Sequence, residues 1–207
     1  MSQSLLPVFP LQLVLFPGML LPLHIFEERY REMIARCLEK KEPFAIVLVQ
    51  NDAVMETATL AEIVAVVKEY PDGRMDILTR GNNRVVLKNV SEAASYLQAE
   101  YSVLEDLNPA AGTELVEKGR NLLRAFIKHS GDEVDEERLG ALPADELGFL
   151  IAAHGGFSLL EKQRFLEMTD ASERLDAQLK LAEILDARAT TDAIERKPIS
   201  TNGKLPH

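Results

Sequence analysis

The residues able to perform acid–base, nucleophilic or metal chemistry are few and lie far apart in the chain. The four histidines are His24, His129, His154 and His207, and the single cysteine is Cys37. No H-E-x-x-H, C-x-x-C or G-x-S-x-G pattern occurs, so the usual spacings of zinc ligands and of a serine nucleophile are absent. The sequence predicts no metal, no cofactor and no catalytic residues, although a site assembled from scattered residues stays open.

The glycines do not form a nucleotide-binding loop either. The only Gly-Lys pair is Gly203-Lys204, which Leu205 follows in place of the Ser or Thr of a phosphate-binding loop, and G-x-G-x-x-G does not occur. We interpret Cys37 as a small buried residue of a helix. His154 precedes two glycines and is expected to cap a helix end. The chemistry therefore favours a binding module over an enzyme.

The most unusual feature is an apolar, proline-rich segment at residues 10–23. An exposed loop rarely carries so many apolar side chains, and such a surface would suit unfolded polypeptides, which offer apolar side chains and free backbone. The candidate polypeptide-binding residues are Val14, Leu15, Phe16, Met19, Leu20 and Leu21. The alternative is that the segment crosses the core and buries them.

The elements that must position this segment change in character halfway along the chain. Apolar runs and alternations predict strands at residues 5–9, 43–50, 59–70, 75–79, 84–90 and 96–104, with one helix at 26–41. Helical periodicity predicts helices at 113–129 and 143–154, then from Ser158 and over 175–187. Ser158 and Glu161 form a capping-box pattern, and Asp170 and Glu173 repeat it. This arrangement predicts an α+β fold.

Residues 108–112 (Asn-Pro-Ala-Ala-Gly) read as a linker between the two halves. We therefore expect a β-rich lobe at residues 1–108, a helical bundle at 113–187 and a weakly ordered tail at 188–207. The net charge of −10 is shared equally between the halves. Because nucleic-acid backbones and anionic membranes recruit Lys and Arg, this charge disfavours both as partners.

The apolar N-terminal stretch does not have the features of a secretory signal. No positive residue precedes its apolar run, prolines interrupt it, and no small-x-small cleavage site follows. No uncharged run is long enough for a membrane helix, and a single cysteine suits a reducing compartment. We expect a cytoplasmic protein.

Residues 7–30 resemble the opening of the N-terminal substrate-binding domain of ATP-dependent Lon proteases. The matching features are Pro7, Phe9-Pro10-Leu11, Phe16-Pro17-Gly18, Pro22–Glu27 and Arg29-Tyr30. Later matches include Thr59–Ile63, Pro71–Arg74, Gly81 with Arg84, Lys162-Gln163, Leu166-Glu167 and Glu173–Leu175, so the resemblance covers residues 5–187. Ala58 and Val85 depart from the family pattern.

The resemblance implies a pseudobarrel like that of PUA domains, followed by a helical bundle. It also implies recognition of polypeptide by a non-catalytic module, because no ATPase or peptidase motif is present. The partner would be an unfolded segment, another protein or a separate protease. The alternative is RNA binding by the PUA-like barrel through Arg74, Arg80, Arg84 and Lys88, which the acidic charge disfavours. A small-molecule site would need convergent polar groups that the sequence does not show.

Overall fold

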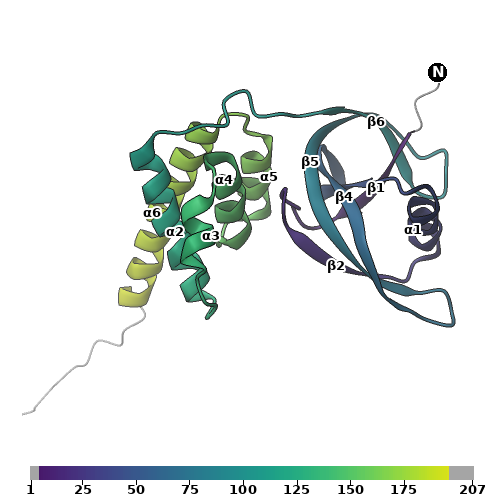
Figure 1. The fold of residues 1–207 in the computed structure, drawn as a ribbon, viewed down its shortest axis with the longest axis horizontal. Coiled ribbons are helices and arrows are strands. Elements are labelled where there is room, and N and C mark those ends of the chain that lie inside the picture. The colour runs from purple at the N-terminus through teal and green to yellow at the C-terminus, as the bar shows by residue number, and fades with distance from the viewer. Residues whose placement is uncertain (1–4, 196–207) are drawn as a thin grey trace, which may run out of the picture.

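The chain folds into a β-rich lobe and a helical lobe joined by one connecting segment (Figure 1). The computed structural model describes residues 5–195, with side chains described for residues 5–187. The expected α+β class is confirmed. The last strand ends at Val103 and the first helix of the helical lobe begins at Thr113.

The β-rich lobe is a six-stranded sheet that closes on itself. Its strands are β1 (Leu6–Leu11), β2 (Leu20–Ile25), β3 (Phe44–Gln50), β4 (Ala53–Glu69), β5 (Met75–Ser91) and β6 (Leu97–Val103). The strand order is β2-β5-β4-β3-β1-β6, and a further pairing of β5 with β6 closes the barrel. Only β1 and β3 run parallel. β2 lies within the segment that the sequence indicated as loop, because an edge strand tolerates the proline that it contains.

β5 is one long strand where the sequence predicted two short ones, and it turns the corner of the barrel. Its first part pairs with β2 and its last part with β6. Gly81 lies opposite Ala61, next to an irregularity in the pairing with β4 between Thr59 and Ala61. A Cβ on Gly81 would lie 2.4 Å from the carbonyl oxygen of Phe16, so only glycine allows this close approach of two backbones.

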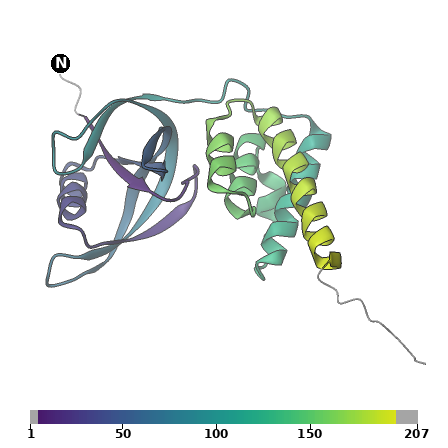
Figure 2. The same ribbon diagram turned by 180° about the vertical axis from the view of Figure 1, so that it is seen from behind.

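α1 (Glu28–Lys40) covers one end of the barrel, on the side away from the helical lobe (Figure 2). Its buried face consists of Tyr30, Met33, Ile34 and Cys37, the three- and four-residue spacing that the sequence showed. These side chains join the barrel core with residues of β1, β3 and β5.

The helical lobe contains α2 (Thr113–His129), α3 (Glu136–Ala141), α4 (Ala144–His154), α5 (Leu159–Glu167) and α6 (Ala171–Glu195). α3 was missed because its segment is short and acidic; Asp135 caps it by accepting from the backbone N–H of Arg138. The capping box of Ser158 and Glu161 is present. α6 extends to Glu195, past the predicted start of the tail, because no glycine or proline interrupts it. The rest of the predicted tail, residues 196–207, lies outside the described residues.

An apolar interface joins the two lobes. Val14, Phe16 and Leu48 of the β-rich lobe belong to the same buried cluster as the core of the helical lobe. The rings of Phe16 and Phe149 lie 6.1 Å apart. Gln163 adds a buried hydrogen bond by donating to the carbonyl oxygen of Thr57 at 3.0 Å. Because the lobes share one core, they should behave as a single rigid unit.

A buried cluster of charges also links the lobes. Asp106, in the connecting segment, pairs with Arg84 of β5 and accepts from Arg174 of α6 at 2.6 Å. The side chains are 4% (Arg84), 0% (Arg174) and 8% (Asp106) exposed. Burial lowers the pKa of the Arg84 guanidinium, and Asp106 opposes that shift.

The two arginines of this cluster are held further by an aromatic ring and by backbone carbonyls. Their guanidinium carbons lie 5.1 Å (Arg84) and 4.1 Å (Arg174) from the ring centre of Phe149. Both donate at 2.7 Å to the carbonyl oxygen of Met168, and Arg84 donates to that of Leu166 at 2.6 Å. The cluster therefore satisfies most of its hydrogen-bonding groups internally, with Nε of Arg174 as an exception, while two guanidinium groups share one carboxylate.

The predicted linker is pinned to the start of α6. Asn108 accepts from the backbone N–H of Ala171 at 2.8 Å and donates from its side chain to Asp170 at 2.9 Å. The hydroxyl of Ser172 donates to the carbonyl oxygen of Ala110 at 3.1 Å. These bonds fix the path of the chain between the lobes.

Candidate functional site

The six candidate residues of the proline-rich segment fall into two groups. Val14, Leu15 and Phe16 are 7%, 1% and 0% exposed, so they lie in the core and cannot reach a ligand in this structure. For these three residues the structure matches the alternative reading, in which the segment crosses the core and buries its apolar side chains. Burial is favoured because the segment carries more apolar surface than a loop usually exposes. Leu20 is 50% exposed, whereas Met19 and Leu21 are half-buried.

A groove of about 490 Å³ lies close to the second group, where β1 ends and β2 meets α1. Its apolar lining includes Phe9, Leu11, Leu23, Phe26, Tyr30 and Val49. Leu21 and Leu23 alternate with exposed residues of β2 and so share its inner face. None of the six candidate residues is part of this lining, which takes Pro10, Leu11, Gln12 and Leu23 from the proline-rich segment. Sequence reasoning missed the lining residues that β3 and α1 contribute.

Phe26 is the most accessible aromatic side chain at the groove, with 59% of its surface exposed. It occupies the position before the N-cap residue Glu27, where an apolar side chain usually packs on the fourth residue of the helix. That residue is Arg31, whose guanidinium donates instead to the carbonyl oxygen of Asp72 at 2.6 Å. Without an apolar partner in its own helix, Phe26 faces solvent, and this mismatch was visible in the sequence.

The aromatic part of the groove is built on Tyr30. Its ring lies 4.2 Å from that of Phe9, and the guanidinium of Arg29 lies 4.5 Å from its centre on the α1 side. Burial is the main cause that raises the pKa of the Tyr30 hydroxyl, with Arg29 opposing. Arg29 is itself paired with Glu27 at 2.8 Å, so this cation does not point into the groove unpartnered.

A small polar network lies at the β2 side of the groove. His24 Nδ1 lies 2.5 Å from one oxygen of Asp76, and the hydroxyl of Tyr70 donates to the other oxygen at 2.8 Å. The hydrogen bond from His24 is the largest cause that holds the pKa of Asp76 below its usual range. The His24 ring stacks with Phe26 at 6.0 Å. Through these contacts the network joins β2 and β5 to the ring of Phe26 at the edge of the groove.

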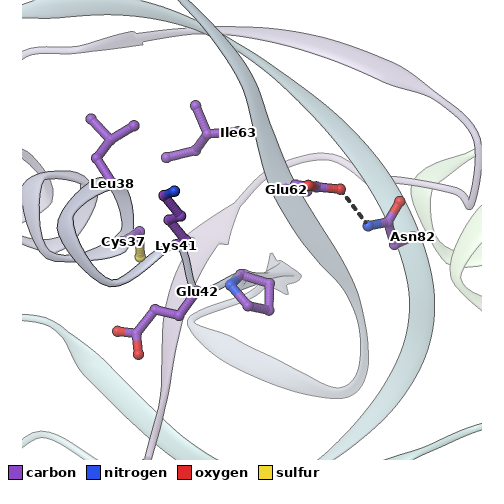
Figure 3. A pocket seen from close by; sticks show the side chains of 8 residues that line it. Cys37, Leu38, Lys41, Glu42, Glu62, Ile63 and Asn82 are labelled. Atoms are coloured by element: carbon purple, nitrogen blue, oxygen red, sulfur yellow. Dashed lines mark hydrogen bonds between the residues drawn. The ribbon is translucent and has the colours of Figure 1, made fainter.

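A second hollow, of about 370 Å³, lies at the other end of α1 (Figure 3). Cys37 and Leu38 line it on one side, and Glu62 accepts a hydrogen bond from Asn82 at 3.1 Å on the other. Burial raises the pKa of Cys37 to about 12, so its thiol stays protonated at neutral pH and is a poor nucleophile. This hollow lacks the exposed aromatic side chain that marks the groove.

The four basic residues considered for RNA binding do not act as a free cluster. Arg84 is buried in the charge cluster between the lobes. Arg74 pairs with Asp72 at 2.7 Å. Arg80 and Lys88 are exposed and form no ion pair with the described residues. Two separate cations would bind a phosphate backbone only weakly, because such binding depends on several Lys and Arg side chains that neutralise phosphates.

Within residues 5–195 no group of three or more His, Cys, Asp or Glu side chains is placed to hold a metal ion. No helix in the same range is long and apolar enough to cross a membrane.

Sequence comparison shows the family. A family model described as the substrate-binding domain of ATP-dependent protease La (LON) matches residues 5–183. The Lon protease of Xanthomonas oryzae pv. oryzae is 28% identical over 93% of this chain and 24% of its own length. That of Vibrio parahaemolyticus is 29% identical over 83% of this chain and 23% of its own length. The chain thus spans about a quarter of the length of these relatives.

Solved structures show the same fold. The Lon N-terminal domain protein from Xanthomonas campestris aligns with a TM-score of 0.70 at 23% identity, covering 86% of this chain and 98% of that one. The N-terminal domain of the Mycobacterium avium complex Lon protease gives 0.70 at 18% identity, covering 87% and 98%. The resemblance read from residues 7–30 is confirmed: the chain belongs to the family of substrate-binding domains of ATP-dependent protease La.

Proposed function

We propose that this chain is a non-catalytic module that binds polypeptide segments in the groove between β1, β2 and α1. The observation that carries the proposal is the exposed ring of Phe26 beside a hollow lined mainly by apolar side chains. Exposed aromatic side chains at a hollow provide binding energy because a partner removes them from water. The family's description as a substrate-binding domain agrees with this chemistry.

The lining of the groove suits polypeptide better than a small polar ligand or a nucleic acid. A small-molecule site needs several polar groups that converge on the ligand, whereas the charged groups here pair with one another. A nucleic acid needs free cations, and Arg29, the cation in the lining, is bound to Glu27. Unfolded segments supply apolar side chains that can pack on the apolar lining of the groove.

The position of the groove supports a recognition role. It lies at the α1 side of the barrel, and the helical lobe packs against the opposite side (Figure 1). The shared core and the charge cluster hold the lobes together, so the groove is presented on a stiff frame and loses little entropy on binding. Delivery of bound segments to a protease, and a cytoplasmic location, belong to the same proposal.

The test compares two exposed apolar residues in a binding titration with a reduced and alkylated model protein, which cannot fold. Phe26→Ser removes the aromatic side chain at the groove, and we expect it to weaken binding by about tenfold or more. Leu160→Ser is the matched control, because Leu160 is 53% exposed on α5 and lies outside the groove. Equal affinities for the two variants would sink the proposal.

A further inference from the structure

Two strand edges without a partner border the groove. Within residues 5–195, β2 stands at the end of the strand order and pairs only with β5, so its other edge has no strand partner in that range. β1 pairs with β6 only through Leu6, Pro7 and Val8. Its last residues, Phe9–Leu11, therefore have no strand on that side among the described residues. An extended segment in the groove would lie next to backbone that could accept a further strand.

A proline interrupts each of these edges. Pro10 lies in the unpaired part of β1, and Pro22 lies near the middle of β2. Neither residue has a backbone N–H. A strand added at either edge would therefore lack the ladder hydrogen bond that this N–H would donate to it. Prolines on open edges are a common protection against strand addition. Both edges that the groove offers are therefore poor templates for a ladder.

The charges at the rim are paired, so the groove presents little net charge to its occupant. Arg29 binds Glu27 at 2.8 Å, and His24 contacts Asp76 at 2.5 Å. Beyond Asp76, the ring of Tyr70 lies under the cations of Lys68 and Arg74, at 4.5 and 5.1 Å. An apolar, uncharged segment complements this rim, whereas a charged side chain would lose water without gaining a free counter-ion.

We infer that the groove reads the side chains of a neutral, apolar segment and does not add that segment to the sheet as a strand. This inference rests on the proposed binding function and specifies the substrate class. Segments that contain proline are acceptable substrates, because recognition makes no demand on their backbone N–H groups. Segments with a Lys or Glu among the apolar anchors are excluded.

The experiment titrates the full chain with a short synthetic peptide that alternates leucine and serine, and with three derivatives. One derivative is N-methylated at alternate residues, and the other two carry Lys or Glu in place of a central leucine. We expect N-methylation to change the affinity by less than about threefold, since no ladder hydrogen bond is lost. Each charged derivative should bind about tenfold more weakly or worse.

The outcomes separate the inference from the proposal beneath it. If the parent peptide binds, and Phe26→Ser but not Leu160→Ser weakens it, the groove binds polypeptide. A loss of more than about tenfold on N-methylation would then overturn side-chain reading in favour of strand addition. Equal affinity for the parent and charged peptides would overturn the inference that the groove excludes segments with a Lys or Glu among the apolar anchors. Failure of the parent peptide and of the unfolded model protein to bind would instead overturn the proposed function.

Discussion

Two regions of this molecule place an arginine against an aromatic ring, and they differ in burial. At the lobe interface, Arg84 and Arg174 lie against Phe149 with side chains that are 4% and 0% exposed. At the groove, Arg29 lies over Tyr30 and is 51% exposed. The buried pair cannot lose a partner without leaving a charge away from water, whereas solvent can replace the partners of Arg29. The arginine–aromatic contact at the lobe interface should therefore contribute to the stability of the fold, whereas the contact at the groove should contribute little.

The largest effect is expected at Asp106, the carboxylate shared by the two buried arginines. Asp106→Ala leaves both guanidinium groups without their counter-ion, and we expect a loss of about 3–5 kcal/mol in the free energy of unfolding. Urea denaturation followed by circular dichroism measures it. Asp176→Ala is the matched control: its pair with Lys180 is on the surface, so its removal should cost less than about 0.5 kcal/mol. Similar losses in the free energy of unfolding for Asp106→Ala and Asp176→Ala would contradict the difference between the buried and the exposed ion pairs.

A smaller effect is expected at Gly148, which makes room for the same arginine. A Cβ at this position would lie 2.9 Å from Nε of Arg174, so Gly148→Ala should destabilise the protein by about 1–3 kcal/mol through overpacking. At Gly140 in α3 a Cβ would meet nothing within 4 Å. Gly140→Ala should leave stability unchanged or raise it by up to about 1 kcal/mol. A Gly148→Ala protein as stable as the native chain would show that Arg174 has freedom to move.

At the groove, removal of the corresponding arginine should have little effect on folding. Arg29→Ala should change the free energy of unfolding by less than about 0.5 kcal/mol. It should change the affinity for an unfolded model protein by less than about threefold, because Arg29 lines the groove as a half-exposed cation already paired with Glu27 and offers little apolar contact. Urea denaturation measures the free energy of unfolding of this variant, and the binding titration with the unfolded model protein measures its affinity. A loss of stability comparable to that of Asp106→Ala would contradict the difference in burial.

The smallest effect concerns Asp76 and pH. Its pKa is depressed in the folded protein, chiefly by the hydrogen bond from His24. The Asp76 carboxylate therefore stabilises the folded protein at pH values above the ordinary carboxyl pKa of about 4. This contribution is lost as the pH falls through the lower pKa that Asp76 has in the folded protein. In an NMR titration, His24→Gln should move the Asp76 pKa upward, towards its ordinary value. An unchanged titration would show that His24 does not support the rim.

The sequence predicted features that depend on neighbours in the chain. Ser158 and Glu161 cap α5 as expected, and the spacing in α1 gave its buried face. The groove could not be predicted in this way, since Phe9, Leu23 and Val49 come from three strands that meet only in the barrel. Arg84 read as a surface cation because its partner, Asp106, lies in another segment. Phe26 was not predicted as a site residue, although the missing staple partner at Arg31 is local and can be read in the sequence.

Methyl NMR tests the central claim, that an open apolar groove on a rigid two-lobe frame binds polypeptide, most directly. An apolar peptide would be added to protein labelled at leucine, isoleucine and valine methyl groups. We predict that shifts concentrate at Leu11, Leu23, Ile25 and Val49, which line the groove, while Leu147 and Leu175 in the helical core stay unchanged. Shifts centred on the lobe interface, with none at the groove, would contradict the account.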